Sequence, residues 1–213
     1  MPHYLLFYKP YNVLTQFTDG EGRPTLKEYI AVPGVYAAGR LDRNSEGLLL
    51  LSDDGEILHR VTHPRWKLPK VYLAQVEGVP SEADLQKLRE GVVIKGEKTA
   101  PAQVALLEHE PHVAPREVRQ YHPTPWLRIV LKEGKKRQIR RMTAAVGYPT
   151  LRLVRVAIGP LTLGTLQPGQ WRELSENERR NLFRALGLNP DHPATLRQRP
   201  PRPRRPGKRR PRQ

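Results

Sequence analysis

A single carboxylate set among arginines is the first feature of this sequence that could do chemistry. Asp42 lies between Arg40 and Arg43 in the segment GRLDRNSEGLLLLSDDG, residues 39–55. Flanking guanidinium groups favour the ionised form of a carboxyl group, and an ionised carboxylate can act as a nucleophile. An aspartate in a turn is more often a simple turn-former. Spacing and charge alone therefore leave both interpretations of Asp42 open.

A run of basic residues is the second such feature. It spans Lys132–Met142, KEGKKRQIRRM. If a helix begins near Gln138, then Arg137, Arg140 and Arg141 stand three and four positions apart, where side chains share one surface. That surface would contact phosphates, and the amide of Gln138 adds a hydrogen-bonding group within the charged run. The alternative is a solvated basic face.

The elements that position these residues follow from the hydrophobic pattern. Four leucines, Leu48–Leu51, come directly after the Asp42 turn and predict a strand buried on both faces. Such a rigid strand would hold the preceding turn in a fixed geometry. The residues Asp53–Gly55 then have the composition of a reverse turn.

Other segments predict a mixture of strands and helices. Strand-like runs occupy Tyr4–Tyr8, Val71–Glu77 and Trp126–Lys132. Ser81 and Ser175 each stand where a helix N-cap is expected, before a helical pattern that a glycine ends. Because there is no regular alternation of strand and helix, the sequence predicts an α+β fold.

Composition limits the kind of function. The chain has 213 residues, 38% of them hydrophobic, and a net charge of +16, which favours a polyanionic partner such as nucleic acid. It has no cysteine, which excludes disulfides, thiolate metal sites and cysteine nucleophiles. Apolar runs are far shorter than the ~20 residues that cross a bilayer. We therefore expect a soluble, cytoplasmic protein that does not enter a membrane.

The last 23 residues differ from the rest of the chain. Residues 191–213 hold eight arginines, one lysine, one aspartate and six prolines, which amounts to half of the net charge. With almost nothing apolar to bury, this segment is expected to stay extended or disordered outside the folded body of residues 1–190. It is either a solvated terminus or an arm that binds polyphosphate.

The motifs together resemble a known family. The segment GRLDRNSEGLLLLSDDG, the segment KVYLAQVEG around Tyr72, and the later segments EGKKRQIRRM and GYPTLRLVRVAIGPLTLG are similar to motifs of the RNA pseudouridine synthases of the small-subunit uridine synthase type. They occur in the family's order over roughly residues 3–188. Many members carry an N-terminal S4 RNA-binding domain, which this chain is expected to lack, and the resemblance is strongest to the shorter large-subunit synthase E type.

The resemblance implies a fold and a set of site residues. The fold would be a mixed, mainly antiparallel sheet with flanking helices, in two lobes around a central cleft. Asp42 corresponds to the catalytic aspartate, Tyr72 to the tyrosine that stacks on the target base and handles its proton, and Arg140 to the arginine that pairs with the aspartate. Leu153 corresponds to a leucine that packs against the site.

The remaining expectations concern the substrate. Candidates for contact with RNA are four basic residues and one amide: Arg40, Arg43, Lys135, Arg137 and Gln138. The implied reaction isomerises uridine to pseudouridine in ribosomal RNA, with 23S rRNA expected from the E type, and it needs neither a cofactor nor a metal. The protein is expected to act as a monomer.

Three alternatives remain at this stage. The charge alone would also suit a non-catalytic RNA-binding or ribosome-assembly protein. An aspartate-dependent hydrolase would need a second carboxylate, for which Asp53 and Asp54 are the nearest candidates in sequence. His59 and His63 have a spacing that could share a metal on a helix, but Pro64 ends that helix, so a helix terminus is the simpler interpretation.

Overall fold

The computed structural model describes residues 2–118 and 121–189. The predicted basic tail, residues 191–213, lies outside the described residues. No helix in these two ranges is long and apolar enough to span a bilayer.

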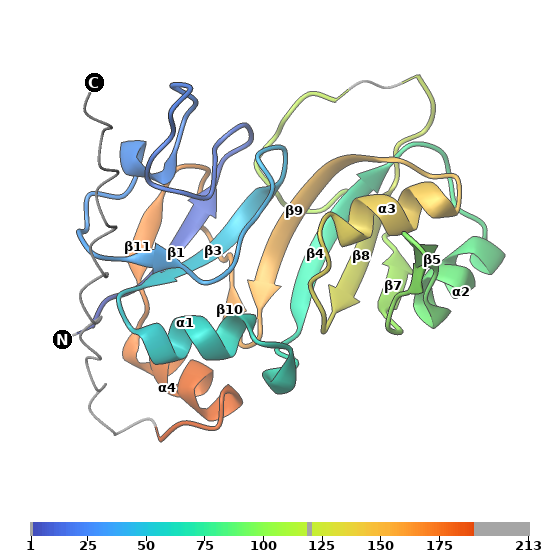
Figure 1. Ribbon diagram of the computed structural model, residues 1–213. Helices are drawn as coiled ribbons and strands as arrows, with labels where there is room; N and C mark the ends of the chain where they lie inside the picture. The colour runs from blue at the N-terminus through green and yellow to red at the C-terminus, as the bar shows by residue number, and fades with distance from the viewer. Residues whose placement is uncertain (1, 119–120, 190–213) are drawn as a thin grey trace, which may run out of the picture.

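One nine-stranded sheet forms the body of the molecule (Figure 1). Along its main path the strands are, in spatial order, β11 (Trp171–Glu173), β1 (Tyr4–Lys9), β3 (Glu46–Ser52), β9 (Thr150–Ile158), β4 (Lys70–Val76), β8 (Trp126–Leu131) and β7 (Gln103–Leu106). The short strands β10 (Leu161–Thr162) and β2 (Tyr36–Ala37) pair with β9 and β3, and β5 (Val93–Ile94) and β6 (Glu97–Lys98) form a separate hairpin. Only β3 and β9 run parallel, which confirms the predicted mainly antiparallel sheet in an α+β fold.

The helices lie against this sheet. They are α1 (Gly55–Thr62), α2 (Glu82–Glu90), α3 (Gln138–Ala145) and α4 (Glu176–Ala185), with short 3-10 turns η1 (Leu26–Glu28) and η2 (Pro64–Trp66). The predicted caps are confirmed, because the side chains of Ser81 and Ser175 accept hydrogen bonds from the third helical amide of α2 and α4. The expected start of α3 at Gln138 is also confirmed.

The reverse turn predicted at Asp53–Gly55 is wrong. Asp54 is instead the N-cap of α1, and its carboxylate accepts hydrogen bonds from the amides of Glu56 and Ile57. Aspartate and glycine are favoured both at the start of a helix and in a turn. The helical pattern after Gly55 decides between the two.

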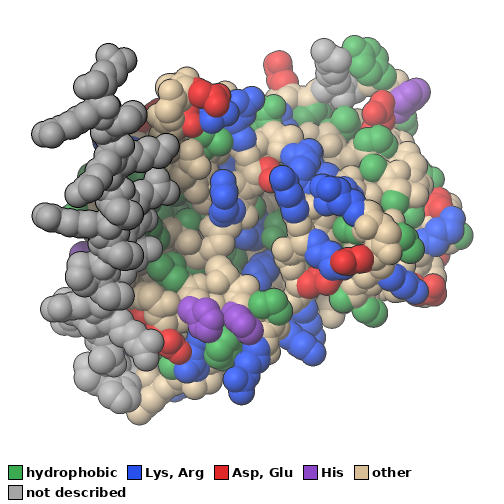
Figure 2. All heavy atoms as spheres, viewed as in Figure 1, with side chains coloured by type: hydrophobic (Ala, Val, Ile, Leu, Met, Phe, Trp, Pro, Cys, Tyr) green, Lys and Arg blue, Asp and Glu red, His purple; other side chains and the backbone are tan. Residues whose placement is uncertain are grey.

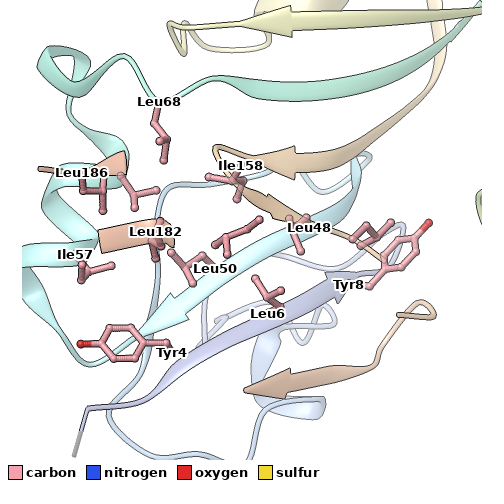
Figure 3. Packing of buried hydrophobic residues seen from close by; sticks show 14 of the residues in the cluster. Tyr4, Leu6, Tyr8, Leu48, Leu50, Ile57, Leu68, Ile158, Leu182 and Leu186 are labelled. Carbon is pink, nitrogen blue, oxygen red and sulfur yellow. The ribbon is translucent and has the colours of Figure 1, made fainter. Parts of the chain in front are cut away.

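Strand β3 is buried on both faces, as the four leucines predict. Leu48 and Leu50 pack with α1 and α4 on one face (Figure 3), whereas Leu49 and Leu51 join the cluster on the other face. All four side chains are fully buried. The strand is therefore a rigid support for the turn that precedes it.

The two halves of the sheet meet at a short junction. Strands β3 and β9 pair at only two positions, Glu46 with Val154 and Gly47 with Arg155. Gly47 has a φ of +104°, and a Cβ there would lie 2.2 Å from the carbonyl oxygen of Arg155, so this close crossing requires glycine. On the face opposite α1 and α4, one apolar cluster lies under each half, and Tyr72 packs against both. This arrangement corresponds to the two lobes that the resemblance implies.

Candidate active site

The turn that carries Asp42 is tied to the N-terminal segment. The amide of Ser45 donates to the carbonyl of Asp42 at 3.0 Å, which closes the turn. One residue earlier, the Thr15 hydroxyl donates to the carbonyl of Leu41 at 2.7 Å, and its oxygen accepts from the Leu41 amide at 3.2 Å. One residue later, the Asn12 amide donates to the carbonyl of Arg43 at 2.8 Å. Backbone groups on both sides of Asp42 are thus fixed.

A buried lysine lies beneath the same turn. Lys9 is fully buried, and its Nζ donates to the carbonyl oxygens of Pro10, Val13 and Arg43 at 2.7, 2.8 and 3.3 Å. Burial lowers the pKa of Lys9 to about 8, although the charges of Glu46 and Asp42 act in the opposite direction. Lys9 therefore adds a positive charge on the inner side of the turn.

Helix α3 holds the turn from the other side. Arg137 and Asp42 form an ion pair, with Nη1 3.6 Å from Oδ2, and the same nitrogen donates to Oδ1 of Asn44 at 3.2 Å. Arg140 donates from Nη2 to the carbonyl of Asn44 at 2.7 Å and from Nη1 to that of Thr150 at 2.9 Å. Both arginines therefore contact the Asp42 turn from the start of α3.

In the structure the contacts of Arg137 and Arg140 with the Asp42 turn differ. Among the described residues, the ion pair of Asp42 is formed by Arg137, whereas Arg140 binds backbone carbonyls. The reason is geometric: Arg137 precedes α3 with a left-handed φ of 53°, which turns its side chain towards the Asp42 turn, while Arg140 lies within the helix. Burial lowers the pKa of Arg140, and the Arg137 charge lowers it further, whereas Asp42 raises it. Asp42 and Arg140 thus interact through their charges without forming an ion pair.

Tyr72 and Leu153 lie on the neighbouring strands β4 and β9. Tyr72 on β4 stands opposite Arg155 of β9 and packs against the cluster that contains Leu41, the residue before Asp42. It also packs against the cluster that contains Leu153 and Ile139, the latter from α3. The structure therefore brings the predicted Asp42, Tyr72, Arg140 and Leu153 to one region.

The predicted RNA contacts have different surroundings. Arg40 and Arg43 are exposed at the Asp42 turn. Lys135 instead forms an ion pair with Glu97 at 2.9 Å. Gln138 is buried and uses both ends of its amide within its own loop: Oε1 accepts from the Lys135 amide and Nε2 donates to Glu133. Gln138 thus shapes the loop before α3.

The second carboxylate required by the hydrolase alternative is not supplied by Asp53 or Asp54. Both follow β3, whereas Asp42 precedes it, and a strand of seven residues spans roughly 20 Å. Asp53 accepts from the amide of His3, and Asp54 accepts from the Tyr4 hydroxyl while capping α1. Neither carboxylate can work beside Asp42.

Sequence reasoning missed a buried ion network at the lobe junction. Glu46 forms a two-bond pair with Arg152, at 3.0 and 2.8 Å, and accepts from Nε of Arg116 at 2.8 Å. The sequence signal for this network was Glu46, an acidic residue at the start of the leucine-rich strand β3. A cavity of about 870 Å³ opens beside this network, with Gln75 among its lining residues. The residues that line this cavity do not include Asp42, Tyr72 or Arg140. We place the candidate site at the Asp42 turn instead, where Arg137, Arg140 and Lys9 lie close to the carboxylate.

Comparison with known proteins identifies the family. Residues 3–145 match the family described as RNA pseudouridylate synthase. The chain belongs to this family. It is 53% identical over 176 residues to ribosomal large subunit pseudouridine synthase E of Vibrio parahaemolyticus, a match that covers 80% of this chain and 73% of the relative. It is 55% identical over 174 residues to the protein of the same name from Xanthomonas campestris, covering 79% and 93%.

A solved structure agrees with this assignment. A crystal structure of a pseudouridylate synthase superposes with a TM-score of 0.73 at 29% identity, over 85% of this chain and 74% of that one. The chain is therefore a pseudouridine synthase, an enzyme that isomerises uridine to pseudouridine. The family predicted from the GRLD, KVY and RQIRR motifs is confirmed.

The geometry suits such a synthase. The Asp42 carboxyl group is about one-third exposed and lies close to Arg137, Arg140 and Lys9. Figure 2 shows lysine and arginine side chains gathered over α3 on the same face. The site thus places a partly exposed carboxyl group among positive charges on a face rich in lysine and arginine.

Proposed function

We propose that this synthase isomerises a specific uridine of ribosomal RNA, with Asp42 as the nucleophile. The observation that carries this proposal is the ion pair between Asp42 and Arg137 on a turn held by hydrogen bonds from two sides. A nucleophilic carboxylate must be fixed in place, and the hydrogen bonds on both sides of the turn support this requirement.

The reaction rearranges the bonds of the substrate. The bond between the base nitrogen and the ribose carbon breaks, the base turns, and a carbon of the ring forms the new bond to the sugar. The proton on that ring carbon leaves and the freed nitrogen takes up a proton, so the composition of the nucleotide is unchanged. Asp42 attacks the sugar or the base ring, and Tyr72 stacks on the turned base and handles its proton. Because substrate and product have the same composition and oxidation state, the reaction needs no cofactor.

The target uridine must leave its stack to reach Asp42. Extruding a base costs a few kcal/mol, which contacts to flanking phosphates offset. Arg40 and Arg43 are exposed beside Asp42 and are suited to such contacts. Arg140 positions the turn, and Leu153 belongs to a cluster against which Tyr72 packs.

We further propose 23S rRNA as the substrate. The support is the names of the relatives, which are large-subunit ribosomal pseudouridine synthases, together with the net charge of +16. We also propose that the enzyme acts as a monomer.

Mapping pseudouridines in ribosomal RNA tests this proposal. RNA from cells with and without the gene is compared at every uridine by a chemical method that labels pseudouridine. The expected result is that a specific uridine of the large-subunit RNA is modified only when the gene is present. Identical maps would contradict the proposal.

A further inference from the structure

The end of α1 and the turn η2 form a compact group of aromatic and basic side chains outside the proposed catalytic residues. The rings of His59 and His63 have centroids 5.0 Å apart, and each lies near Trp66, at 5.6 and 5.4 Å. The guanidinium carbons of Arg60 and Arg65 lie 5.1 and 5.8 Å from the Trp66 ring centre. We name the six side chains of this group the α1–η2 patch: His59, Arg60, His63, Arg65, Trp66 and Lys67.

Several hydrogen-bond donors of the α1–η2 patch are unused. His63 accepts through Nδ1 from the backbone amide of Arg65 at 3.1 Å, so a neutral His63 ring carries its proton on Nε2. Within residues 2–118 and 121–189, no hydrogen bond or ion pair engages the His59 ring, the His63 Nε2 or the Arg65 guanidinium. Arg60 differs, because it pairs with Glu56 and donates to the carbonyl of Leu186. Arg60 and Trp66 therefore form the scaffold, and the other side chains present free donors.

The unpaired charges of the α1–η2 patch are positive, because the one carboxylate in contact with it among the described residues, Glu56, is paired with Arg60. Residues 57–76 contain no aspartate or glutamate, while this stretch includes Arg60, Arg65, Lys67 and Lys70. His59, His63, Arg65 and Lys67 are exposed. A surface whose unpaired groups are donors and cations fits an anion, and on an enzyme that acts on RNA the matching anion is a backbone phosphate.

The α1–η2 patch adjoins the candidate site. A Cβ on Gly39 would lie 3.5 Å from Cγ2 of Thr62, so the last residue of α1 meets the segment three residues before Asp42. At the other side, Lys70 donates from Nζ to the carbonyl of Val61 at 3.4 Å, which ties α1 to the strand of Tyr72. In Figure 2, histidine side chains lie beside lysine and arginine side chains over the end of α1, and the surface is hollowed between them and the basic group over α3.

From these observations we propose that the α1–η2 patch binds the phosphates of the RNA strand that leaves the candidate site. His59, His63, Arg65 and Lys67 contact these phosphates, and Trp66 and Arg60 hold the four side chains in place. This inference rests on the proposed function, because it takes RNA as the substrate. It adds a second contact surface, separate from Arg137 and Arg140, that strengthens binding without touching the reacting uridine.

The test compares RNA binding and turnover in matched variants. The first variant combines His59→Gln, His63→Asn and Arg65→Gln, where the asparagine side chain keeps an acceptor for the η2 amide. A milder variant carries Arg65→Gln alone, in case the triple change disturbs folding. Lys87→Gln is the control, since it removes one positive charge, paired with Asp84, from α2 at the far end of the molecule in Figure 1.

Binding is measured by fluorescence anisotropy with a labelled RNA stem–loop that has uridines in its loop, over a series of salt concentrations. We expect the triple variant to bind about tenfold more weakly, and its log–log salt slope to fall by about 1 for each phosphate that it no longer neutralises. Arg65→Gln should show a smaller change in the same direction, and Lys87→Gln should match the wild type within about twofold. At saturating rRNA, the single-turnover rate of the triple variant should equal that of the wild type.

The outcomes separate this inference from the proposed function. If the triple and single variants bind with the affinity and salt slope of the wild type, the α1–η2 patch is not an RNA surface. Equal weakening by Lys87→Gln would likewise overturn the inference, because the effect would then be general charge. If the wild type produces no pseudouridine in rRNA, the proposed function fails, while the binding comparison still decides the inference.

Discussion

Arg140 donates from Nη2 to the carbonyl oxygen of Asn44 at 2.7 Å, two residues beyond Asp42. The same guanidinium donates from Nη1 to the carbonyl of Thr150 at the start of β9. One side chain of α3 therefore joins the Asp42 turn to the other lobe of the sheet. The carboxylate itself is met by Arg137, one helical turn earlier. Arg137 therefore provides the charge opposite the carboxylate, and Arg140 fixes the backbone of the turn.

Replacing Arg140 with lysine tests its positioning role. A lysine ammonium is a point donor and cannot reproduce a planar fork that serves two carbonyls from different elements. We expect Arg140→Lys to lower the single-turnover rate at least about tenfold, while RNA affinity changes by less than about threefold. Arg141→Lys is the matched control, because no hydrogen bond of its side chain is found among the described residues. Equal rates for Arg140→Lys and wild type would contradict this role.

Thr15 is expected to matter for the same turn from the opposite side. Thr15→Val keeps the shape of the side chain but removes both hydrogen bonds to the backbone of Leu41. Their removal should lower the free energy of unfolding by about 1–2 kcal/mol and reduce turnover through movement of Asp42. Urea denaturation and single-turnover kinetics measure the two effects. Thr18→Val, at a nearby exposed position, should leave both unchanged.

Lys9 gives a prediction for pH dependence. Burial lowers its pKa to about 8 in the folded protein, whereas lysine in an unfolded chain titrates at about 10.4. Between these values the unfolded state binds more protons, so the contribution of Lys9 to stability rises with pH. From pH 7 to pH 10, the unfolding free energy of the wild type should therefore rise by roughly 2 kcal/mol relative to Lys9→Met. Parallel pH profiles would show that the Lys9 amine is not held in a desolvated site.

Gly47 should be intolerant of any side chain. A Cβ at its φ of +104° would lie 2.2 Å from a backbone oxygen of β9 at the lobe junction. We expect Gly47→Ala to destabilise the protein by more than about 3 kcal/mol. Gly20→Ala should change stability by less than about 0.5 kcal/mol, because nothing lies within 4 Å of the added atom. Thermal unfolding of the two variants compares them directly.

The main fold was predictable because local signals agreed with burial. The leucines of β3 and the serine caps of α2 and α4 each have one favourable placement, and the structure uses it. Asp53–Gly55 was misjudged since a turn and a helix start use the same residue types. In each of these places the outcome depends on neighbours in sequence.

The site was harder to predict because it depends on contacts between distant segments. Arg137 and Arg140 are identical residues in one run, and only the left-handed backbone at Arg137 decides which of them reaches Asp42. The burial of Lys9 against the carbonyl of Arg43 joins residues that lie 34 positions apart. No sequence pattern within β1 specifies that contact.

The central claim is that the Asp42 carboxylate attacks the substrate, and Asp42→Asn tests it most directly. The change keeps the size of the side chain and its place in the turn but removes the charge. Single-turnover conversion of uridine in the mapped rRNA fragment is measured for both proteins, alongside their affinity for that fragment. We predict that Asp42→Asn produces no detectable pseudouridine while its affinity stays within about threefold of the wild type. Conversion at the wild-type rate by Asp42→Asn would contradict the account.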